Sequence, residues 1–267
     1  MRYGWARADF ARGKTMLQIR TAQWQALQAG GLRQFEHEMV RHLSGFAPEL
    51  AQVMGKERMH ELVRIGLARG QAYGYTNRGP LRSYLETMLA LGSHFDTDPV
   101  LARATSVLRS EGVPQLASAA ALHEGIAEYF KQVNGPRNEY ALAAMTRTRD
   151  VPYEALPGGG DVRARAFVLF RGGFPQKYHY AKEDALQSLW TSSELRSAEF
   201  GLKSEAGRLL VVSLMYGYGH GVFSDPAYRW TADTMRDPAL PDPEQRAQHL
   251  YRKNRLYLTA ALKNLAP

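Results

Sequence analysis

Apolar residues recur at every third or fourth position along most of the chain, which is the spacing of helices with one buried face. Within residues 16–46, for example, Met39 and Leu43 fall on one face, and Gly30 and Gly31 are expected to break or bend the helix. Glycines and prolines separate the helical segments. The expected helices span residues 16–46, 56–73, 80–89, 99–109, 117–133, 137–149 and 162–170.

One segment lacks the helical pattern. Residues 151–161 contain two prolines and three consecutive glycines, the composition of a linker. The apolar stretch that follows it, residues 162–170, fits either a short strand or a helix when it is considered alone.

The chain contains an internal repeat at an offset of 127 residues. Residues 43–99 align with residues 170–226 without gaps, and three of the nine identities are glycines and two are prolines. Glycine adopts backbone angles that other residues avoid, and proline fixes the φ angle. Their common spacing therefore predicts the same turns in both halves. The repeat also favours a helix over residues 162–170, because the aligned stretch of the first half is helical in pattern.

We therefore predict an all-α protein with two homologous helical units in tandem that pack as a bundle. The first unit is expected over residues 16–112 and the second over residues 160–267. Residues 113–159 would supply connecting helices and the Gly/Pro linker, and residues 1–15 an N-terminal arm. Either Met1 or Met16 could be the native start.

The stretch Gly92–Ala102 holds His94, Asp96 and Asp98, a combination that suggests a metal site or an acid–base cluster. The second copy replaces His94 by glycine and Asp96 by phenylalanine but keeps the Asp-Pro pair. Aspartate followed by proline is typical of a helix start, where the carboxylate accepts a backbone N–H. The predicted structural caps are Gly74, Gly92, Asp98, Pro99, Gly201, Gly219, Asp225 and Pro226.

The second copy of this turn, residues 215–230, is richer in aromatic residues than the first. Aromatic side chains provide contact area in protein interfaces at a low entropic cost. They could equally fill the core between the two units. The candidate partner-binding residues are Tyr216, Tyr218, His220, Phe223, Tyr228 and Trp230.

Composition narrows the class of protein. The 267 residues contain no apolar run of about 20 residues, so no membrane span is expected. The basic N-terminus has no apolar stretch behind it, so we expect no signal peptide and a cytoplasmic location. The absence of cysteine excludes disulfides, thiolate metal sites and a cysteine nucleophile.

A net charge of +8 would suit an anionic partner, but the basic residues are dispersed, so nucleic-acid binding is not expected. The Gly-rich stretch at residues 157–161 lacks the lysine and hydroxyl residue of a phosphate-binding loop. A serine elbow and a calcium loop are also missing. We therefore expect no enzyme activity and no catalytic, cofactor-binding or metal-binding residues.

The string "RIGLARGQAYGYTNRGPLRSYLETMLALGSHFDTDP", Arg64–Pro99, resembles a domain of uncharacterised proteins from Gram-negative bacteria. In those proteins an aromatic-glycine turn precedes a helix that ends in Leu-Gly, followed by Phe-Asp-x-Asp-Pro. A tryptophan usually follows soon after; it is present as Trp230 in the second unit, whereas Arg103 occupies the position in the first. Such proteins are often encoded beside spike and effector genes of type VI secretion systems.

The resemblance implies a non-catalytic, chaperone-like adaptor that binds a secretion effector or its loading partner. An immunity protein that neutralises a cognate toxin is the alternative. A secreted helical toxin and a nucleic-acid-binding protein rank lower.

Overall fold

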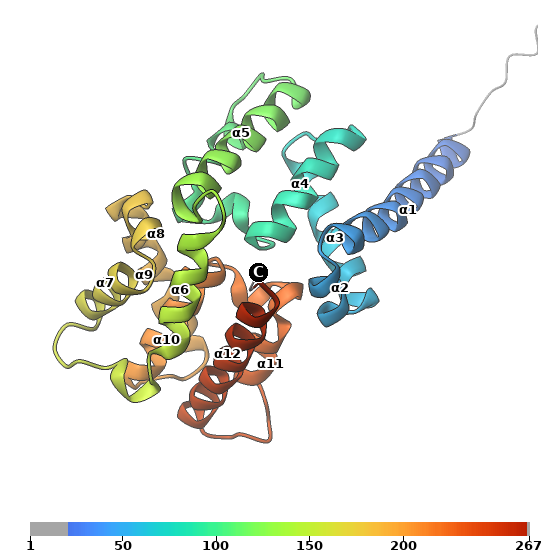
Figure 1. Ribbon diagram of the computed structural model, residues 1–267. Helices are drawn as coiled ribbons and strands as arrows, with labels where there is room; N and C mark the ends of the chain where they lie inside the picture. The colour runs from blue at the N-terminus through green and yellow to red at the C-terminus, as the bar shows by residue number, and fades with distance from the viewer. Residues whose placement is uncertain (1–20, 266–267) are drawn as a thin grey trace, which may run out of the picture.

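The computed structural model describes the backbone of residues 21–265 and the side chains of residues 30–264, so the expected arm at residues 1–15 and Met16 lie outside it. Within the described residues the chain forms twelve α-helices, six 3-10 helices and no strand, which confirms the predicted all-α class (Figure 1). No helix among them is apolar over a length that could cross a bilayer. The α-helices are α1 (Thr21–Phe46), α2 (Pro48–Met54), α3 (Lys56–Ala72), α4 (Arg78–Leu91), α5 (Gln115–Val133), α6 (Glu139–Asp150), α7 (Val162–Gly173), α8 (Pro175–Tyr180), α9 (Glu183–Glu199), α10 (Glu205–Tyr218), α11 (Arg229–Met235) and α12 (Pro243–Leu265). The 3-10 helices are η1 (Phe95–Thr97), η2 (Pro99–Leu101), η3 (Ser106–Arg109), η4 (Tyr153–Ala155), η5 (Val222–Ser224) and η6 (Pro226–Tyr228).

The helices of the two halves begin and end at matching positions. A shift of 127 residues carries α3 onto α9 and α4 onto α10 at both ends, and it carries η1 and η2 onto η5 and η6. The glycines that follow the matched helices also share a backbone conformation, with φ of 94° at Gly92 and 103° at Gly219. This agreement of boundaries is what the predicted duplication requires, and we refer to the two halves as the first and second units.

The correspondence continues beyond residue 112, where the sequence pattern ended the first unit. Helix α5 packs on α4, and α12, which begins 128 residues after α5, packs on α10. The side chain of Gln115, at the start of α5, accepts hydrogen bonds from the backbone N–H groups of Thr76 and Asn77, both at 2.9 Å. Glu244, at the start of α12, does the same for the aligned Lys203 and Ser204. Helix α5 therefore belongs structurally with the first unit, and α6 is the helix that connects the two.

Two local expectations were wrong. Helix α1 runs through Gly30 and Gly31 without a break, since two glycines weaken a helix by about 1 kcal/mol each but do not prevent it. The helix expected over residues 99–109 forms only the short 3-10 segments η2 and η3. There the hydroxyl groups of Thr105 and Ser106 bond to preceding backbone carbonyls and compete with regular helix geometry.

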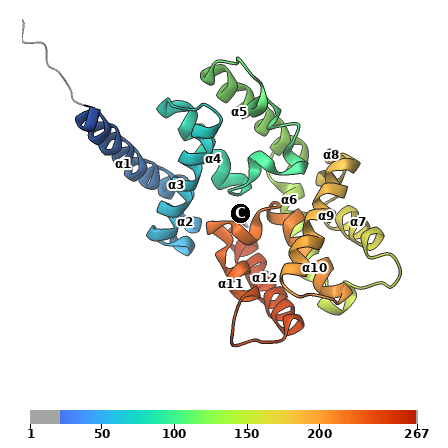
Figure 2. The same ribbon diagram turned by 180° about the vertical axis from the view of Figure 1, so that it is seen from behind.

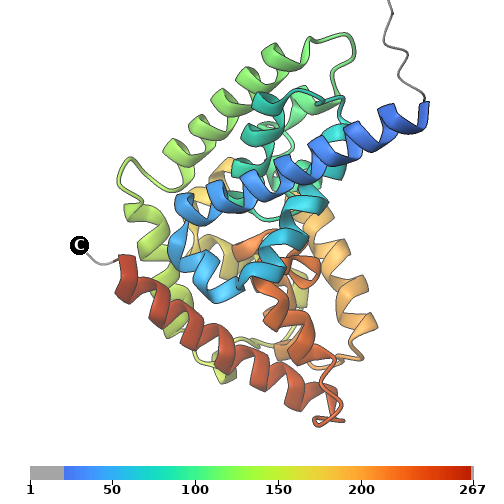
Figure 3. The same ribbon diagram turned by 90° about the vertical axis from the view of Figure 1, so that its right-hand side faces the viewer.

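Each unit has its own hydrophobic core. Leu62 and Met88 are fully buried in the first, and the aligned Leu189 and Met215 are buried in the second. The two units lie one against the other (Figure 3), and α6 packs against α7 and α12 of the second unit. Their contact is reciprocal, because η2 packs on α9 while η6 packs on α3.

Candidate functional site

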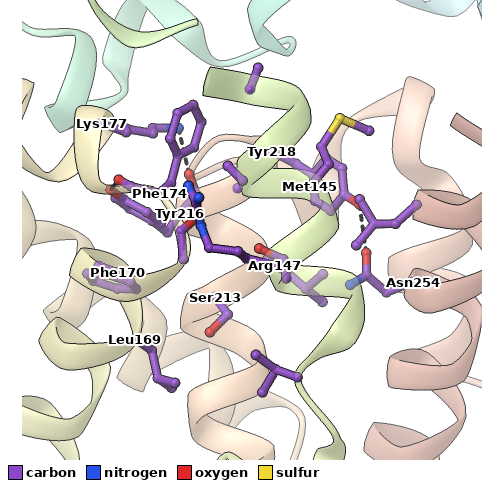
Figure 4. Close-up of a pocket in the computed structure, with 18 of the residues that line it drawn as sticks. Met145, Arg147, Leu169, Phe170, Phe174, Lys177, Ser213, Tyr216, Tyr218 and Asn254 are labelled. Carbon is purple, nitrogen blue, oxygen red and sulfur yellow. Dashed lines mark hydrogen bonds between the residues drawn. The ribbon is translucent and has the colours of Figure 1, made fainter. Parts of the chain in front are cut away.

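A large cavity lies between the connecting helix α6 and helices α7, α10 and α12 of the second unit, and Tyr129 and Phe130 of α5 also line it (Figure 4). Figure 2 shows the arrangement of these helices from behind. The volume of the cavity is about 1080 Å³, just above the range of about 300–1000 Å³ that is typical of small-molecule sites. Most of the wall is apolar, and Phe170, Phe174 and Tyr216 form one side of it.

The space results from small side chains on facing helices. Helix α6 presents Ala141 and Ala144 to the cavity, and α10 presents Ser213 and Gly217. A Cβ atom at Gly217 would have no atom within 4 Å. Protein interiors are normally packed closely, so an unfilled apolar space of this size is a candidate binding site.

Lys177, on the short helix α8, is the buried cation of the cavity. Its side chain is 7% exposed, and its Nζ donates a hydrogen bond to the Tyr216 carbonyl oxygen at 2.5 Å (Figure 4). The ammonium also lies 5.2 Å from the centre of the Tyr216 ring. Burial lowers the pKa of Lys177, and the negative charge of Asp98 opposes part of that effect.

Asp98 and Asp225 join the two units in a reciprocal arrangement. Each carboxylate caps its own 3-10 helix, Asp98 by accepting from Val100 N at 2.9 Å and Asp225 by accepting from Ala227 N at 2.8 Å. The second oxygen of each accepts a backbone N–H from the other unit, because His220 donates to Asp98 at 2.9 Å and Ser93 donates to Asp225 at 2.7 Å.

The predicted cap residues meet at this junction. A Cβ at Gly92 would lie 3.2 Å from an oxygen of Asp225, and one at Gly219 would lie 3.3 Å from the Leu91 carbonyl oxygen. Only glycine combines this close approach with the positive φ angles found there. Gly74 and Gly201 also have positive φ angles where α3 and α9 end, so the eight predicted cap residues lie at equivalent turns of the two units.

The candidate partner-binding aromatics do not form an exposed surface. Tyr216 and Phe223 are buried, and Tyr218, His220, Tyr228 and Trp230 are half-buried. Tyr218, Tyr228 and Trp230 pack around Tyr257 of α12, with ring centres 5.7, 6.1 and 5.8 Å from that of Tyr257. These contacts show packing between α10, α11 and α12, and the partner-binding role of the six residues stays a prediction. Tyr216, Tyr218 and Tyr228 nevertheless line the cavity.

Asp96, from the acidic cluster of the first unit, bonds to other side chains of that unit. Asp96 is 1% exposed and accepts hydrogen bonds from Arg69, at 3.1 and 2.5 Å, and from the Tyr84 hydroxyl at 2.8 Å. Burial raises the pKa of Asp96, but the bonds from Arg69 and Tyr84 outweigh this and lower it overall. Burial also lowers the pKa of His94 to about 4. Among the described residues, no group of three or more histidine, aspartate or glutamate side chains is placed to hold a metal ion.

The sequence interpretation overlooked Lys177. In the repeat its counterpart is Leu50, which is half-buried against the first core. A lysine that replaces an apolar residue at an inward-facing position of a repeat is a usable signal for a functional side chain.

Comparison of the chain with protein-family models, with curated proteins and with solved structures found no match.

Proposed function

We propose that this chain is a non-catalytic binding protein whose cavity receives the apolar part of a protein partner. The observation that carries the proposal is the cavity itself, about 1080 Å³ in volume and mostly apolar in its wall. A partner that buries apolar side chains in this cavity gains about 25 cal/mol of binding free energy for each Å² of apolar surface removed from water. Helix-in-groove recognition uses the same physics, with a few apolar side chains as anchors.

The resemblance of Arg64–Pro99 supplies the proposed setting. The partner would be a type VI secretion effector or its loading partner, and the chain would act in the cytoplasm as a chaperone-like adaptor. An immunity protein would use the same kind of binding to block a toxin. Protection of a cell that makes the toxin would favour immunity, whereas loss of effector export on deletion of the gene would favour an adaptor.

A cavity-filling variant tests the proposal. Gly217→Trp places an indole in the open space at α10, and Gly45→Trp is the matched control, because Gly45 is an exposed helical residue with no atom within 4 Å of its Cβ position. In pull-downs from the native organism, we expect the wild-type chain and Gly45→Trp to retain the partner and Gly217→Trp to lose it at least tenfold. Retention of the partner by a folded Gly217→Trp variant would refute the cavity as the binding site.

A further inference from the structure

Three positively charged side chains line the cavity: Arg147, Arg165 and Lys177. Within the part of the chain that the structure describes, none of its three cations pairs with a carboxylate. Each instead donates to backbone carbonyl oxygens: Lys177 to Tyr216, Arg147 to Gly173 at 3.0 Å, and Arg165 to Leu156 at 3.0 Å.

The anions of the cavity wall already have partners. Both carboxylate oxygens of Asp98 accept backbone N–H groups, and the side chain of Asp150 is bonded by Arg149 at 2.8 and 3.1 Å. The charge of Asp98 acts on Lys177 through space, but the two groups form no ion pair within 4 Å. The cavity therefore presents an excess of positive charge.

Lys177 has unused hydrogen-bonding capacity. An ammonium group has three N–H donors, and Lys177 uses one of them in the described structure. Lysine is almost never fully buried without a charged or strongly polar partner, because an ammonium group loses strong hydration when it is removed from water. An acidic group brought in by an occupant would complete its bonding.

Packing alone does not require a lysine at this position. The aligned residue of the first unit is Leu50, and the residue aligned with Tyr216 is Leu89. Both units fold around the same arrangement of helices with or without the Lys177–Tyr216 pair. The cation is therefore a property of the second unit and of its cavity.

We propose that the segment of the protein partner that enters the cavity carries a carboxylate among its apolar side chains, and that this carboxylate binds Lys177. This inference rests on the proposed function, since it names the chemistry of the same occupant. The apolar side chains would lie along α6, α10 and α12, and the carboxylate would lie against α8.

Dodecanoate is a suitable probe, because it combines an apolar chain with one carboxylate, and 1-dodecanol is its uncharged counterpart. In calorimetric titrations of the full chain, we expect dodecanoate to bind at least tenfold more tightly than dodecanol. Lys177→Leu, which copies the residue of the first unit, should remove this difference and leave dodecanol binding unchanged. Lys131→Leu, on the exposed face of α5, is the matched control and should behave as wild type.

The outcomes separate the two proposals. Equal affinity of the wild type for both probes, or an unchanged preference in Lys177→Leu, overturns the charge inference and leaves the cavity as an apolar site. If neither probe binds and Gly217→Trp keeps the partner, the proposed function fails. If dodecanoate binds through Lys177 without displacing the partner, the occupant is a free acyl carboxylate and the inference about the partner is wrong. Should Lys177→Leu not fold by circular dichroism, the comparison of the two probes on the wild type still decides the role of charge.

Discussion

Asp98 and Asp225 occupy the same position in the repeat and are equally buried, yet their surroundings differ. Burial raises the pKa of both. For Asp98, the nearby His220 ring, the hydrogen bond from the His220 backbone N–H and the charge of Lys177 outweigh burial and lower the pKa overall. For Asp225, the backbone N–H groups of Ser93 and Ala227 compensate only part of the effect, and its pKa is raised. One residue type thus has opposite electrostatic roles in the two units.

This difference predicts opposite changes in acid stability. Because the pKa of Asp98 is lowered on folding, its contribution is present above the ordinary range near 4 and is lost as the pH falls through the folded pKa. Because the pKa of Asp225 is raised, the free energy of unfolding gains from its protonation as the pH falls toward the ordinary range. We expect Asp98→Asn to cost about 1–3 kcal/mol at pH 7, since an amide leaves one backbone N–H without an acceptor, and Asp225→Asn to cost less.

Urea unfolding between pH 7 and pH 3 checks the prediction. Loss of stability on acidification should be shallower in Asp98→Asn and steeper in Asp225→Asn than in the wild type. Asp161→Asn, at the exposed cap of α7, serves as a control for the same substitution at a solvated position. A change in the same direction for both buried variants would contradict the assignment.

At the scale of elements, the last helix of each unit begins with a side chain that accepts hydrogen bonds from the start of an earlier long helix of the same unit. Gln115 of α5 performs this task for α4, and Glu244 of α12 performs it for α10. Burial raises the pKa of Glu244, but hydrogen bonds from Ser204 and Lys203 outweigh this and lower it overall. The two acceptors are not aligned in the repeat. The contact therefore depends on how the two helices pack and not on one residue shared by both units.

Alanine substitutions should separate the charged acceptor from the neutral one. Glu244→Ala is expected to reduce the free energy of unfolding by about 1.5–3 kcal/mol, and Gln115→Ala by about 0.5–1.5 kcal/mol, because hydrogen bonds to charged groups are the stronger ones. Urea unfolding measures both. Glu124→Ala, an exposed side chain in the middle of α5, should stay within about 0.5 kcal/mol of the wild type. A larger loss in Gln115→Ala than in Glu244→Ala would contradict this interpretation.

At this scale the sequence predicted much of the structure. The helices over residues 56–73, 117–133 and 137–149 appear within about two residues of their expected bounds. The helix expected over residues 99–109 does not form, and α1 continues through Gly30 and Gly31. Apolar periodicity predicts which face of a helix is buried, but it does not show whether hydroxyl side chains such as Thr105 compete for the backbone.

At the scale of the whole molecule, the two units pack like the halves of an isologous dimer within one chain. Each contributes a 3-10 helix to the other, and each Asp caps its own turn while it accepts a hydrogen bond from the opposite unit. Ala227 of η6 packs into the core of the first unit. These contacts join the two cores. If one unit unfolds, the other therefore loses packing and hydrogen-bond partners.

We therefore expect the chain to unfold as one cooperative unit. Hydrogen exchange followed by mass spectrometry should give the same opening free energy for the core amides of α4 and α10. Loss of one carboxylate in Asp98→Ala should lower both values by similar amounts. Exchange in α10 that slows or speeds independently of α4 would show that the units open separately.

The sequence by itself determined the helical class, the register of the repeat and the turns at Gly92, Asp98, Gly219 and Asp225, because these depend on local periodicity and on backbone preferences. Only the tertiary structure decided that the aromatic residues of the second unit pack around Tyr257, that α5 belongs with the first unit and that Lys177 faces an apolar cavity with Arg147 and Arg165. These properties depend on which helices lie next to one another, and residues far apart in sequence create them together. Lys177 stands at the repeat position that Leu50 occupies in the first unit. The groups that surround its charge come from segments that only folding brings together.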